Sequence, residues 1–446
     1  MSDEITAAGF EAADGTGDWR ALGRGASALF RTRSPGEGAV LLERVRVLAD
    51  GADHQPDVDL RPGGVVVRVV SHDVGGLSAR DVALAGEISA AAADLGLAAD
   101  PAGVQEVELT IDAVDREQVM PFWGAVLGHA RTGEDLVDPH GRWPGIWFQA
   151  SDEHRPLRNR LHVDVFVPHD VRQARVDAAL AAGGRVTTEE FVPHWWTLAD
   201  GDGNEADVMA QEDVQGHHEG DLESGVEGDL PAGVLAAQEF GTAGGVEDWR
   251  VLQGASAYYA TGGFDAGVEL VVRAVRAAEE GGVPVLADLR YSGATLRLAA
   301  SEGGGIDAAR LRVARRVQAA ARDLGLRAEP AVLRDVQLTF DALDLHAVRR
   351  FWAAALGYTA RGSTGLEDPW GRGPSVFLQQ LGSPREQRNR IHVDVMVPAD
   401  VADARVAAAV AAGGTVVRET PFWRTVADPE GNEVDVAVVP GWAEAG

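Results

Sequence analysis

Apolar residues follow a strand pattern and a helix pattern in the first hundred positions. Val65–His72 alternates apolar and polar residues as a strand does, while Leu41–Asp50 and Ala79–Leu97 place apolar residues at helical spacing. Ser78 precedes the second helix and is suited to cap it. These segments predict a small α+β domain with helices on one face of an antiparallel sheet.

The next hundred residues predict two βαβββ modules. Strands are expected at 107–112 and 146–150, with a helix between them that stops at Gly128. A second strand and helix follow over 161–184, and a hairpin is expected around Asp200–Gly203.

Most of this pattern occurs twice. The segment VELTIDAVDREQVMPFWGAVLG (107–128) returns as VQLTFDALDLHAVRRFWAAALG (336–357), and RNRLHVDVFVP (158–168) returns as RNRIHVDVMVP (388–398). A fixed offset of this kind indicates one duplication that covers nearly the whole chain. The predicted units are a small domain at 1–102, paired modules at 103–212, a linker at 213–233, a second small domain at 234–331 and second paired modules at 332–446. The linker is rich in Gly and acidic residues, and such a composition buries too little apolar surface to fold.

Composition narrows the possible functions. The formal charge of −29, without a Lys/Arg cluster, disfavours binding to nucleic acid. No apolar stretch has the length of a membrane span, and the acidic start lacks the features of a signal peptide, so we expect a cytoplasmic protein. The absence of cysteine excludes disulfides and thiolate metal sites.

The first small domain contains a turn and a helix start that resemble the pterin-4a-carbinolamine dehydratase family. DHQPDVDL and VVVRVVSHDVGGLSARDVALA carry the resemblance, which covers about residues 5–100. The matching positions are His54, Pro56, His72, Gly76, Leu77, Ser78 and Asp81. The resemblance implies removal of water from a 4a-hydroxytetrahydropterin, with no cofactor or metal required.

This reaction needs a proton donor at the departing hydroxyl and an acceptor for the N5 proton, and imidazoles suit both roles. The candidate catalytic residues are His54, His72, Gln55 and Asp81. Gln55 stands where the family has a second consecutive histidine, and a glutamine binds a pterin by hydrogen bonds but transfers no proton near pH 7. Asp50 or Asp53 is a candidate to orient a histidine. The alternative is a domain kept for ligand binding or dimerisation.

The second small domain lacks these groups. Aligning Leu289–Arg290 with Leu60–Arg61 places Val283, Pro284 and Ser301 at the positions of His54, Gln55 and His72. We expect this domain to be structural and to pair with the first as a pseudo-twofold partner, within a monomer or a homodimer.

The paired modules resemble the glyoxalase-like branch of the vicinal oxygen chelate superfamily, over about 104–211 and 333–440. FWGAVLG, RNRLHVDV and GNEADV, with their second copies, carry this resemblance. It implies two βαβββ modules that curl into a cup, where inward side chains hold a divalent metal when one is present. Carried over, the first cup would hold Glu108, His162 and Asp207, and the second would hold Gln337, His392 and Asp435.

An imidazole with one or two carboxylates suits Fe, Mn, Ni or Zn and leaves positions open for substrate. A metal is considered for the first cup, with a hydrogen-bonded cup histidine as its alternative, and that alternative is favoured for the second cup. The arginines 158, 160, 388 and 390 either clamp an anion or form ion pairs within the protein. The tryptophans 123, 143, 147, 195 and 196 either form a wall for a planar ligand or pack in the core.

Three functions remain open. The favoured one is a pterin-4a-carbinolamine dehydratase whose cups bind a small molecule, either a pterin or another planar polar ligand. The second is a metal-dependent glyoxalase or dioxygenase in the cups, and the third is a non-catalytic protein that sequesters a small molecule. Gln55 favours the third over the first, and the unequal loss of polar residues favours activity in the first copy.

Overall fold

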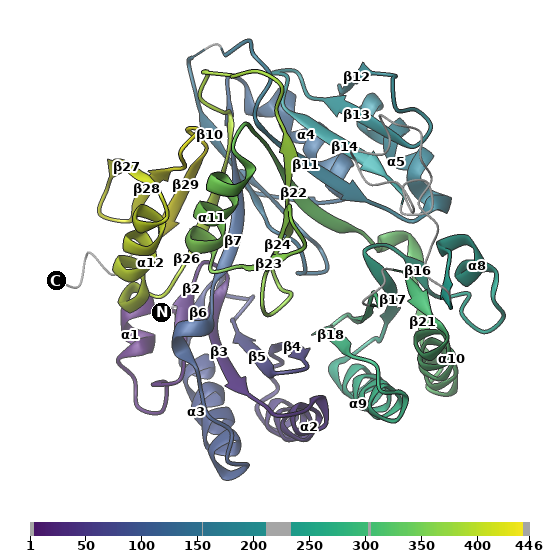
Figure 1. The fold of residues 1–446 in the computed structure, drawn as a ribbon. Helices are drawn as coiled ribbons and strands as arrows, with labels where there is room; N and C mark the ends of the chain where they lie inside the picture. Colours follow the sequence, from purple (N-terminus) through teal and green to yellow (C-terminus); the bar gives the residue numbers. More distant parts are fainter. Residues whose placement is uncertain (1–3, 154, 211–232, 302–304, 440–446) are drawn as a thin grey trace.

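The computed structural model describes residues 4–153, 155–210, 233–301 and 305–439. The chain is a mixed α+β protein in which two small helix-covered domains lie on one side and two larger sheets lie on the other (Figure 1). The predicted linker, including His217 and His218, lies outside the described residues except for its last position.

The first small domain packs two helices against an antiparallel sheet. Its elements are β1 (Glu4–Ile5), α1 (Ala7–Glu11), β2 (Arg20–Leu22), β3 (Gly25–Arg31), α2 (Pro35–Ala52), β4 (Asp57–Arg61), β5 (Gly64–Val69), β6 (Leu77–Ser78) and α3 (Ala79–Asp94). The predicted strand and both predicted helices are confirmed with small shifts in their bounds. Ser78 caps α3 and shares a capping box with Asp81, so the sequence signal at this helix start is confirmed as well.

The second small domain repeats this order. Its elements are β15 (Val234–Leu235), α8 (Ala237–Thr242), β16 (Arg250–Val251), β17 (Gly254–Ala260), α9 (Phe264–Gly281), β18 (Val285–Arg290), β19 (Gly293–Ala299), β20 (Ile306–Asp307), α10 (Ala308–Asp323) and β21 (Arg327–Ala328).

The two small domains share one continuous sheet. Strand β4 pairs with β18 in antiparallel register, with Asp59 opposite Asp288 at the centre. Asp59 and Asp288 are equivalent positions of the repeat, so each domain uses the same strand surface to contact the other, as in a twofold-symmetric interface. This arrangement is the internal pseudo-twofold that the duplication predicts.

The remaining strands form two sheets, which we name cup A and cup B. Cup A contains β7 (Glu106–Ala113), β8 (Ala130–Thr132), β9 (Asp135–Val137), β10 (Ile146–Ala150), β26 (Ile391–Met396), β27 (Thr415–Glu419), β28 (Trp423–Ala427) and β29 (Glu433–Ala437). Cup B contains β11 (Leu161–Phe166), β12 (Arg185–Thr188), β13 (Trp195–Ala199), β14 (Glu205–Met209), β22 (Asp335–Ala342), β23 (Thr359–Arg361), β24 (Gly365–Glu367) and β25 (Ser375–Gln380).

Each cup therefore takes one module from each copy, and the expectation that one copy builds one cup is wrong. Strand β7 pairs with β26, which places Glu108 opposite Asp394, and β22 pairs with β11, which places Gln337 opposite Asp164. The first strands of the two copies have nearly the same apolar pattern, so either can complete either sheet.

The module helices keep each copy together across this exchange. Helix α4 (Arg116–Leu127) packs on α5 (His169–Ala181), and α11 (Leu345–Leu356) packs on α12 (Ala399–Ala411). The buried indoles of Trp123 and Trp352 donate hydrogen bonds to Asp200 and Asp428 in the hairpins of the same copy. One apolar core consequently includes residues of both copies.

Each small domain forms an ion pair with a helix of one cup, in addition to contacts with the other cup. Arg20 of the first small domain pairs with Asp400 at the start of α12 in cup A, and Arg250 of the second pairs with Asp170 at the start of α5 in cup B. We call the first small domain with cup A the first half, and the second small domain with cup B the second half.

Candidate functional sites

The first small domain brings His54 and Asp81 into direct contact. His54 follows the left-handed residue Asp53 (φ 47°) that ends α2, and Asp81 lies in the first turn of α3. The Nε2 of His54 lies 2.7 Å from a carboxylate oxygen of Asp81, which is fully buried. Asp81, rather than Asp50 or Asp53, therefore orients this imidazole.

Three more donors hold the Asp81 carboxylate. The Ser71 hydroxyl (2.7 Å), the Ser78 hydroxyl (3.0 Å) and the Ser78 amide (2.8 Å) all donate to its second oxygen. Burial alone would raise the pKa of Asp81, but the hydrogen bonds from His54, Ser71 and Ser78 outweigh it and lower that pKa below its ordinary value. The carboxylate therefore stays charged and fixes the orientation of His54.

His72 and Gln55 flank this pair. His72 is exposed and directly follows Ser71, while Gln55 is half-buried beside His54. Asp81 thus connects the turn at His54 with the strand end at Ser71, the residue that precedes His72 in the sequence.

The second small domain has no comparable pair at these positions. Val283 is buried, and Arg310 occupies the place of Asp81 in the first turn of α10. Arg310 pairs with Asp307, the residue that caps this helix, at 2.7 Å. A cation and an apolar side chain replace the carboxylate and the imidazole, which agrees with a structural role.

Cup A gathers one histidine and several carboxylates on adjacent strands. His392, Asp394 and Asp435 offer ligand atoms that all lie within 4.8 Å of one another. Glu108 is opposite Asp394 on β7, and the neighbouring Thr110 donates a hydrogen bond to Asp394.

Cup B has the same framework with one change. His162, Asp164 and Asp207 form the equivalent group, and Thr339 donates to Asp164 at 2.6 Å. Gln337 is opposite Asp164, in the place that Glu108 has in cup A.

The predicted ligand sets are therefore regrouped. Glu108 lies with His392 and Asp435, and Gln337 lies with His162 and Asp207, because the strands exchange between copies. The sequence prediction also omitted Asp164 and Asp394. The HVD spacing contained their signal, because residues two apart on a strand point to the same face.

Burial and charge raise the pKa values of the cup A acids. Burial, together with the charges of Glu106 and Asp394, raises the pKa of Glu108 to about 7. Burial and Asp435 raise the pKa of Asp394 to about 6 despite the charge of His392. Burial alone would lower the pKa of His392, but the nearby carboxylates, with Asp435 at 3.6 Å, raise it.

Among the titratable groups of cup B, the histidine has the pKa that differs most from its counterpart in cup A. Burial lowers the pKa of His162 to about 4, so this imidazole is neutral at physiological pH. Burial and Glu205 raise the pKa of Asp207 to about 7, although Thr197 donates a hydrogen bond to it.

The donor set of cup A fits a divalent metal. Asp394 and Asp435 each bury one carboxylate oxygen that accepts no hydrogen bond from the described residues. Buried oxygens without a donor are costly, and a cation would satisfy them. One imidazole with carboxylates is a ligand set that suits Mn, Fe or Zn.

The arginines beside the cups form ion pairs and structural hydrogen bonds. Arg158 pairs with Glu205, and Arg388 pairs with Glu433 at 2.8 Å. Arg160 and Arg390 are buried and donate across the copies, to Asn432 and Asn204 respectively. The ion-pair alternative therefore describes Arg158 and Arg388, while Arg160 and Arg390 make structural hydrogen bonds.

Cup B also borders a large cavity. Its volume is about 880 Å³, and its wall includes Trp195, Asp207 and Gln337 from the cup and Leu252 and Gln253 from the second small domain. Of the other tryptophans, Trp123 and Trp143 are buried in the core, and Trp147 is 43% exposed.

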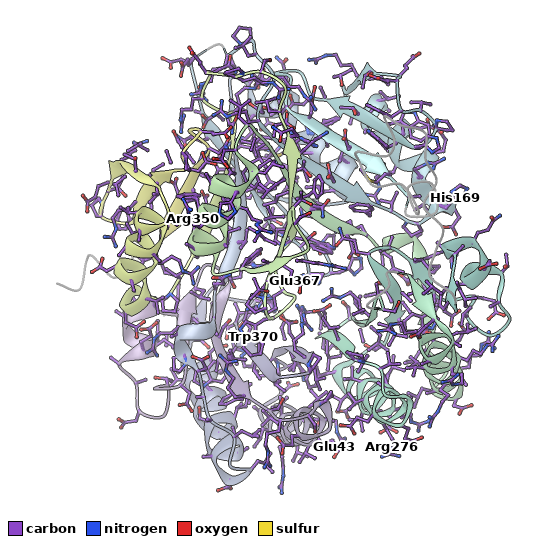
Figure 2. All side chains as sticks on the ribbon, in the orientation of Figure 1. Glu43, His169, Arg276, Arg350, Glu367 and Trp370 are labelled. Atoms are coloured by element: carbon purple, nitrogen blue, oxygen red, sulfur yellow. The ribbon has the colours of Figure 1, made fainter. Side chains whose placement is uncertain are left out.

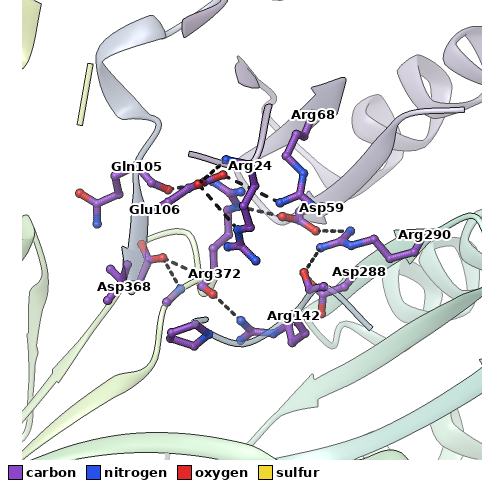
Figure 3. Close-up of a pocket in the computed structure, with 14 residues that line it drawn as sticks. Arg24, Asp59, Arg68, Gln105, Glu106, Arg142, Asp288, Arg290, Asp368 and Arg372 are labelled. Carbon is purple, nitrogen blue, oxygen red and sulfur yellow. Dashed lines mark hydrogen bonds and ion pairs between the residues drawn. The ribbon is translucent and has the colours of Figure 1, made fainter. Parts of the chain in front are cut away.

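A second, polar cavity lies at the pseudo-twofold and serves structure. Asp59 and Asp288 meet there with Arg290, Arg142 and Arg372 (Figure 3). Its volume of about 20 Å³ leaves room for little more than one water molecule. Trp370 lies close by, at the junction of cup B with the first small domain, where the Arg31 guanidinium stacks over its ring (Figure 2).

Family profiles match three parts of the chain. The family described as pterin 4 alpha carbinolamine dehydratase matches residues 2–91, and the family described as glyoxalase-like domain matches residues 108–209 and 337–437. Within the described ranges, no helix is long and apolar enough to cross a membrane.

Curated relatives match the first small domain. A Nocardia farcinica protein, provisionally named a pterin-4-alpha-carbinolamine dehydratase, is 35% identical over 71 residues, which cover 16% of this chain and 75% of the relative. A Chloroflexus aggregans protein with the same provisional name is 37% identical over 59 residues, which cover 13% of this chain and 63% of the relative.

Solved structures match less than a quarter of the chain, with low TM-scores. A glyoxalase-related enzyme from Fulvimarina pelagi is 21% identical with a TM-score of 0.20, covering 24% of this chain and 88% of that one. An integron cassette protein from V. cholerae is 18% identical with a TM-score of 0.17, covering 22% of this chain and 90% of that one.

The fold and the matched regions define a multidomain protein that joins a dehydratase-like domain to glyoxalase-like domains. Through its first small domain the chain belongs to the pterin-4a-carbinolamine dehydratase family, and both paired-module regions are glyoxalase-like.

Proposed function

We propose that the first small domain dehydrates a pterin-4a-carbinolamine. The observation that carries this proposal is the 2.7 Å hydrogen bond between His54 and the buried Asp81. A fixed carboxylate sets the tautomer of a histidine and stabilises its protonated form, which is the arrangement that a general base needs.

The reaction breaks the C4a–O bond and removes the N5 proton, so that a C4a–N5 double bond forms and water leaves. With one ring nitrogen donating to Asp81, the other nitrogen of His54 is available to accept the N5 proton. The exposed His72 supplies a proton to the departing hydroxyl, and Gln55 binds the pterin through its amide.

The test is turnover of a 4a-hydroxytetrahydropterin by the full chain, followed by the absorbance of the quinonoid product. We expect His54→Ala to lower kcat at least about 100-fold, the usual contribution of a general base. Asp81→Asn should lower kcat and also change its pH profile, because Asp81 acts through His54. Gln55→His should raise kcat, because it adds a proton-transferring group.

The control is His346→Ala, which removes an exposed histidine of α11 and should leave turnover unchanged. A His54→Ala protein with wild-type kcat would contradict the proposal, and so would a wild-type chain without turnover.

A second activity is favoured by the partnerless oxygens of Asp394 and Asp435. In this proposal His392, Asp394 and Asp435 would hold a divalent metal in cup A, with Glu108 as a neighbouring carboxylate. A metal bound there supplies Lewis-acid polarisation of a substrate oxygen. The cup residues themselves orient the metal site, since Thr110 fixes one oxygen of Asp394.

A further inference from the structure

The cavity of about 880 Å³ is built by two parts of the chain that the sequence repeat separates. One wall comes from cup B strands β13, β14, β22 and β25, and the other comes from the β16–β17 turn and from Ile306 of the second small domain. Small-molecule sites in proteins usually measure about 300–1,000 Å³ and combine apolar walls with a few polar groups.

The two parts are held in fixed relation, so the cavity is already formed. Leu252 of the turn is 1% exposed and packs with Phe166 and Met209 of cup B. The Ser375 hydroxyl donates to the Gln253 side chain at 3.2 Å and accepts from the Gln337 amide at 3.0 Å. The second small domain, although it lacks the dehydratase residues, thus closes one side of this cavity.

The side chains in the wall select the shape and charge of a ligand. Phe191 and Trp195 stack at 4.2 Å with an interplanar angle of 14° and form a flat aromatic surface. Arg158 is paired with Glu205, and Arg361 lies 3.6 Å from Glu367, so the arginines at the cavity are already neutralised. A planar ligand without phosphate groups fits this surface better than a polyanion does.

The floor of the cavity provides a specific polar contact. Asp207 lines the cavity and is 9% exposed. Gln337 also lines the cavity, from β22, which β11 separates from β14 in the sheet. A carboxylate pairs best with two adjacent N–H donors, such as the amino-pyrimidinone edge of a pterin.

We propose that this cavity, cup B closed by the second small domain, is a metal-independent binding site for a pterin-type heteroaromatic. The ligand stacks on Phe191 and Trp195 and directs its amino-pyrimidinone edge at Asp207. The identity of the ligand rests on the proposed dehydratase function, because that function makes pterins the molecules on which this chain acts. The second small domain then serves as a binding wall beside a catalytic first domain.

The test is calorimetric titration of the full chain with 2-amino-4-oxopteridine, a stable oxidised pterin. To separate this site from the dehydratase site, the titration uses the His54→Ala protein. We expect one bound pterin, about tenfold weaker affinity in Trp195→Ala from lost stacking, and at least about tenfold weaker affinity in Asp207→Asn. The 2,4-dioxo analogue, which lacks the amino donor, should bind more weakly than the pterin.

The matched control is Trp423→Ala, because Trp423 begins β28 of cup A as Trp195 begins β13 of cup B. It should leave the pterin affinity within twofold. Circular dichroism and the unfolding midpoint verify that each variant is folded. Equal affinity in wild type, Trp195→Ala and Asp207→Asn would overturn the proposal, and so would pterin binding that requires added Mn²⁺.

This experiment also separates the two proposals. Pterin bound at the cavity by a chain without turnover would overturn the dehydratase function and leave the site intact. Turnover that depends on His54, together with no pterin bound by the His54→Ala protein, would overturn the cavity site alone.

Discussion

The two halves of the molecule have the same backbone plan but different titratable side chains. The first half has the His54–Asp81 pair in its small domain, and Glu108 lies beside His392, Asp394 and Asp435 in its cup. In the second half Val283 and Arg310 occupy the small-domain positions, and Gln337 replaces Glu108. The His54–Asp81 pair and Glu108 thus belong to the first half, and the second half borders the cavity of about 880 Å³.

The strand exchange determines which residues of the two copies lie in the same cup. If each copy built its own cup, Glu108 would lie with His162 and Gln337 would lie with His392. The exchange instead unites Glu108 with His392, whose pKa is raised. The strand exchange therefore determines which first-strand residue, Glu108 or Gln337, shares a cup with each histidine.

The halves depend on each other at the buried charges of the pseudo-twofold. Asp288 pairs with Arg61 and lies within 3.5 Å of Arg142 and Arg297. We expect Asp288→Ala to lower the free energy of unfolding by about 3–5 kcal/mol, because it leaves buried guanidinium groups without their partner. Urea denaturation of the full chain measures this change.

The matched control is Asp400→Ala, which breaks the Arg20 ion pair on the surface. Its carboxylate is 58% exposed, so the loss should stay below about 1 kcal/mol. If both variants lost the same stability, the pseudo-twofold would not be the joint that holds the halves together.

Metal affinity should distinguish the two cups. We expect Asp435→Asn to weaken Mn²⁺ binding about 100-fold or more, since it removes a ligand from the cup A group. The equivalent change in cup B, Asp207→Asn, should leave Mn²⁺ affinity unchanged. Equilibrium dialysis with metal analysis measures both affinities.

A gain-of-function variant sharpens this contrast. Gln337→Glu gives cup B the carboxylate that Glu108 provides in cup A, so it should add a second, weaker Mn²⁺ site. One unchanged equivalent of metal in this variant would show that the first-strand residue does not account for the difference between the cups.

The sequence predicted the helices and strands better than it predicted which strands pair with one another. Periodicity located α2, α3 and β5, and the motif around His54 located a pair that the structure brings within 2.7 Å. Periodicity could not predict the exchange of β7 and β22. The pattern of a strand indicates which of its faces is buried, but it does not indicate whether the strand pairs with β11 or with β26.

Contacts between distant residues were missed for the same reason. Arg61 and Asp288 lie 227 positions apart, so no local sequence pattern indicates their ion pair. Asp394 did have a local signal, since it lies two residues after His392 on one strand face, but the family resemblance directed attention to Asp435 instead.

The smallest predicted effect concerns pH and cup A. The pKa of Glu108 is raised to about 7 and that of Asp394 to about 6, so both acids bind protons more tightly in the folded protein than when unfolded. The stability from these protonated acids is therefore present below about pH 4, and it is lost as the pH rises through 6 and 7. A metal competes with the same protons, so Mn²⁺ affinity should increase severalfold between pH 6 and pH 8.

Glu108→Gln separates this effect from the titration of the other acids. The variant lacks the group with the pKa of about 7, so its Mn²⁺ affinity should change less between pH 6.5 and pH 8 than that of wild type. Without metal, it should also lose less stability over that range, because no buried acid at position 108 has to ionise. Parallel pH profiles for the two proteins, in both measurements, would mean that Glu108 is not linked to the cup A group, and the contrast between the cups would then rest on His392 alone.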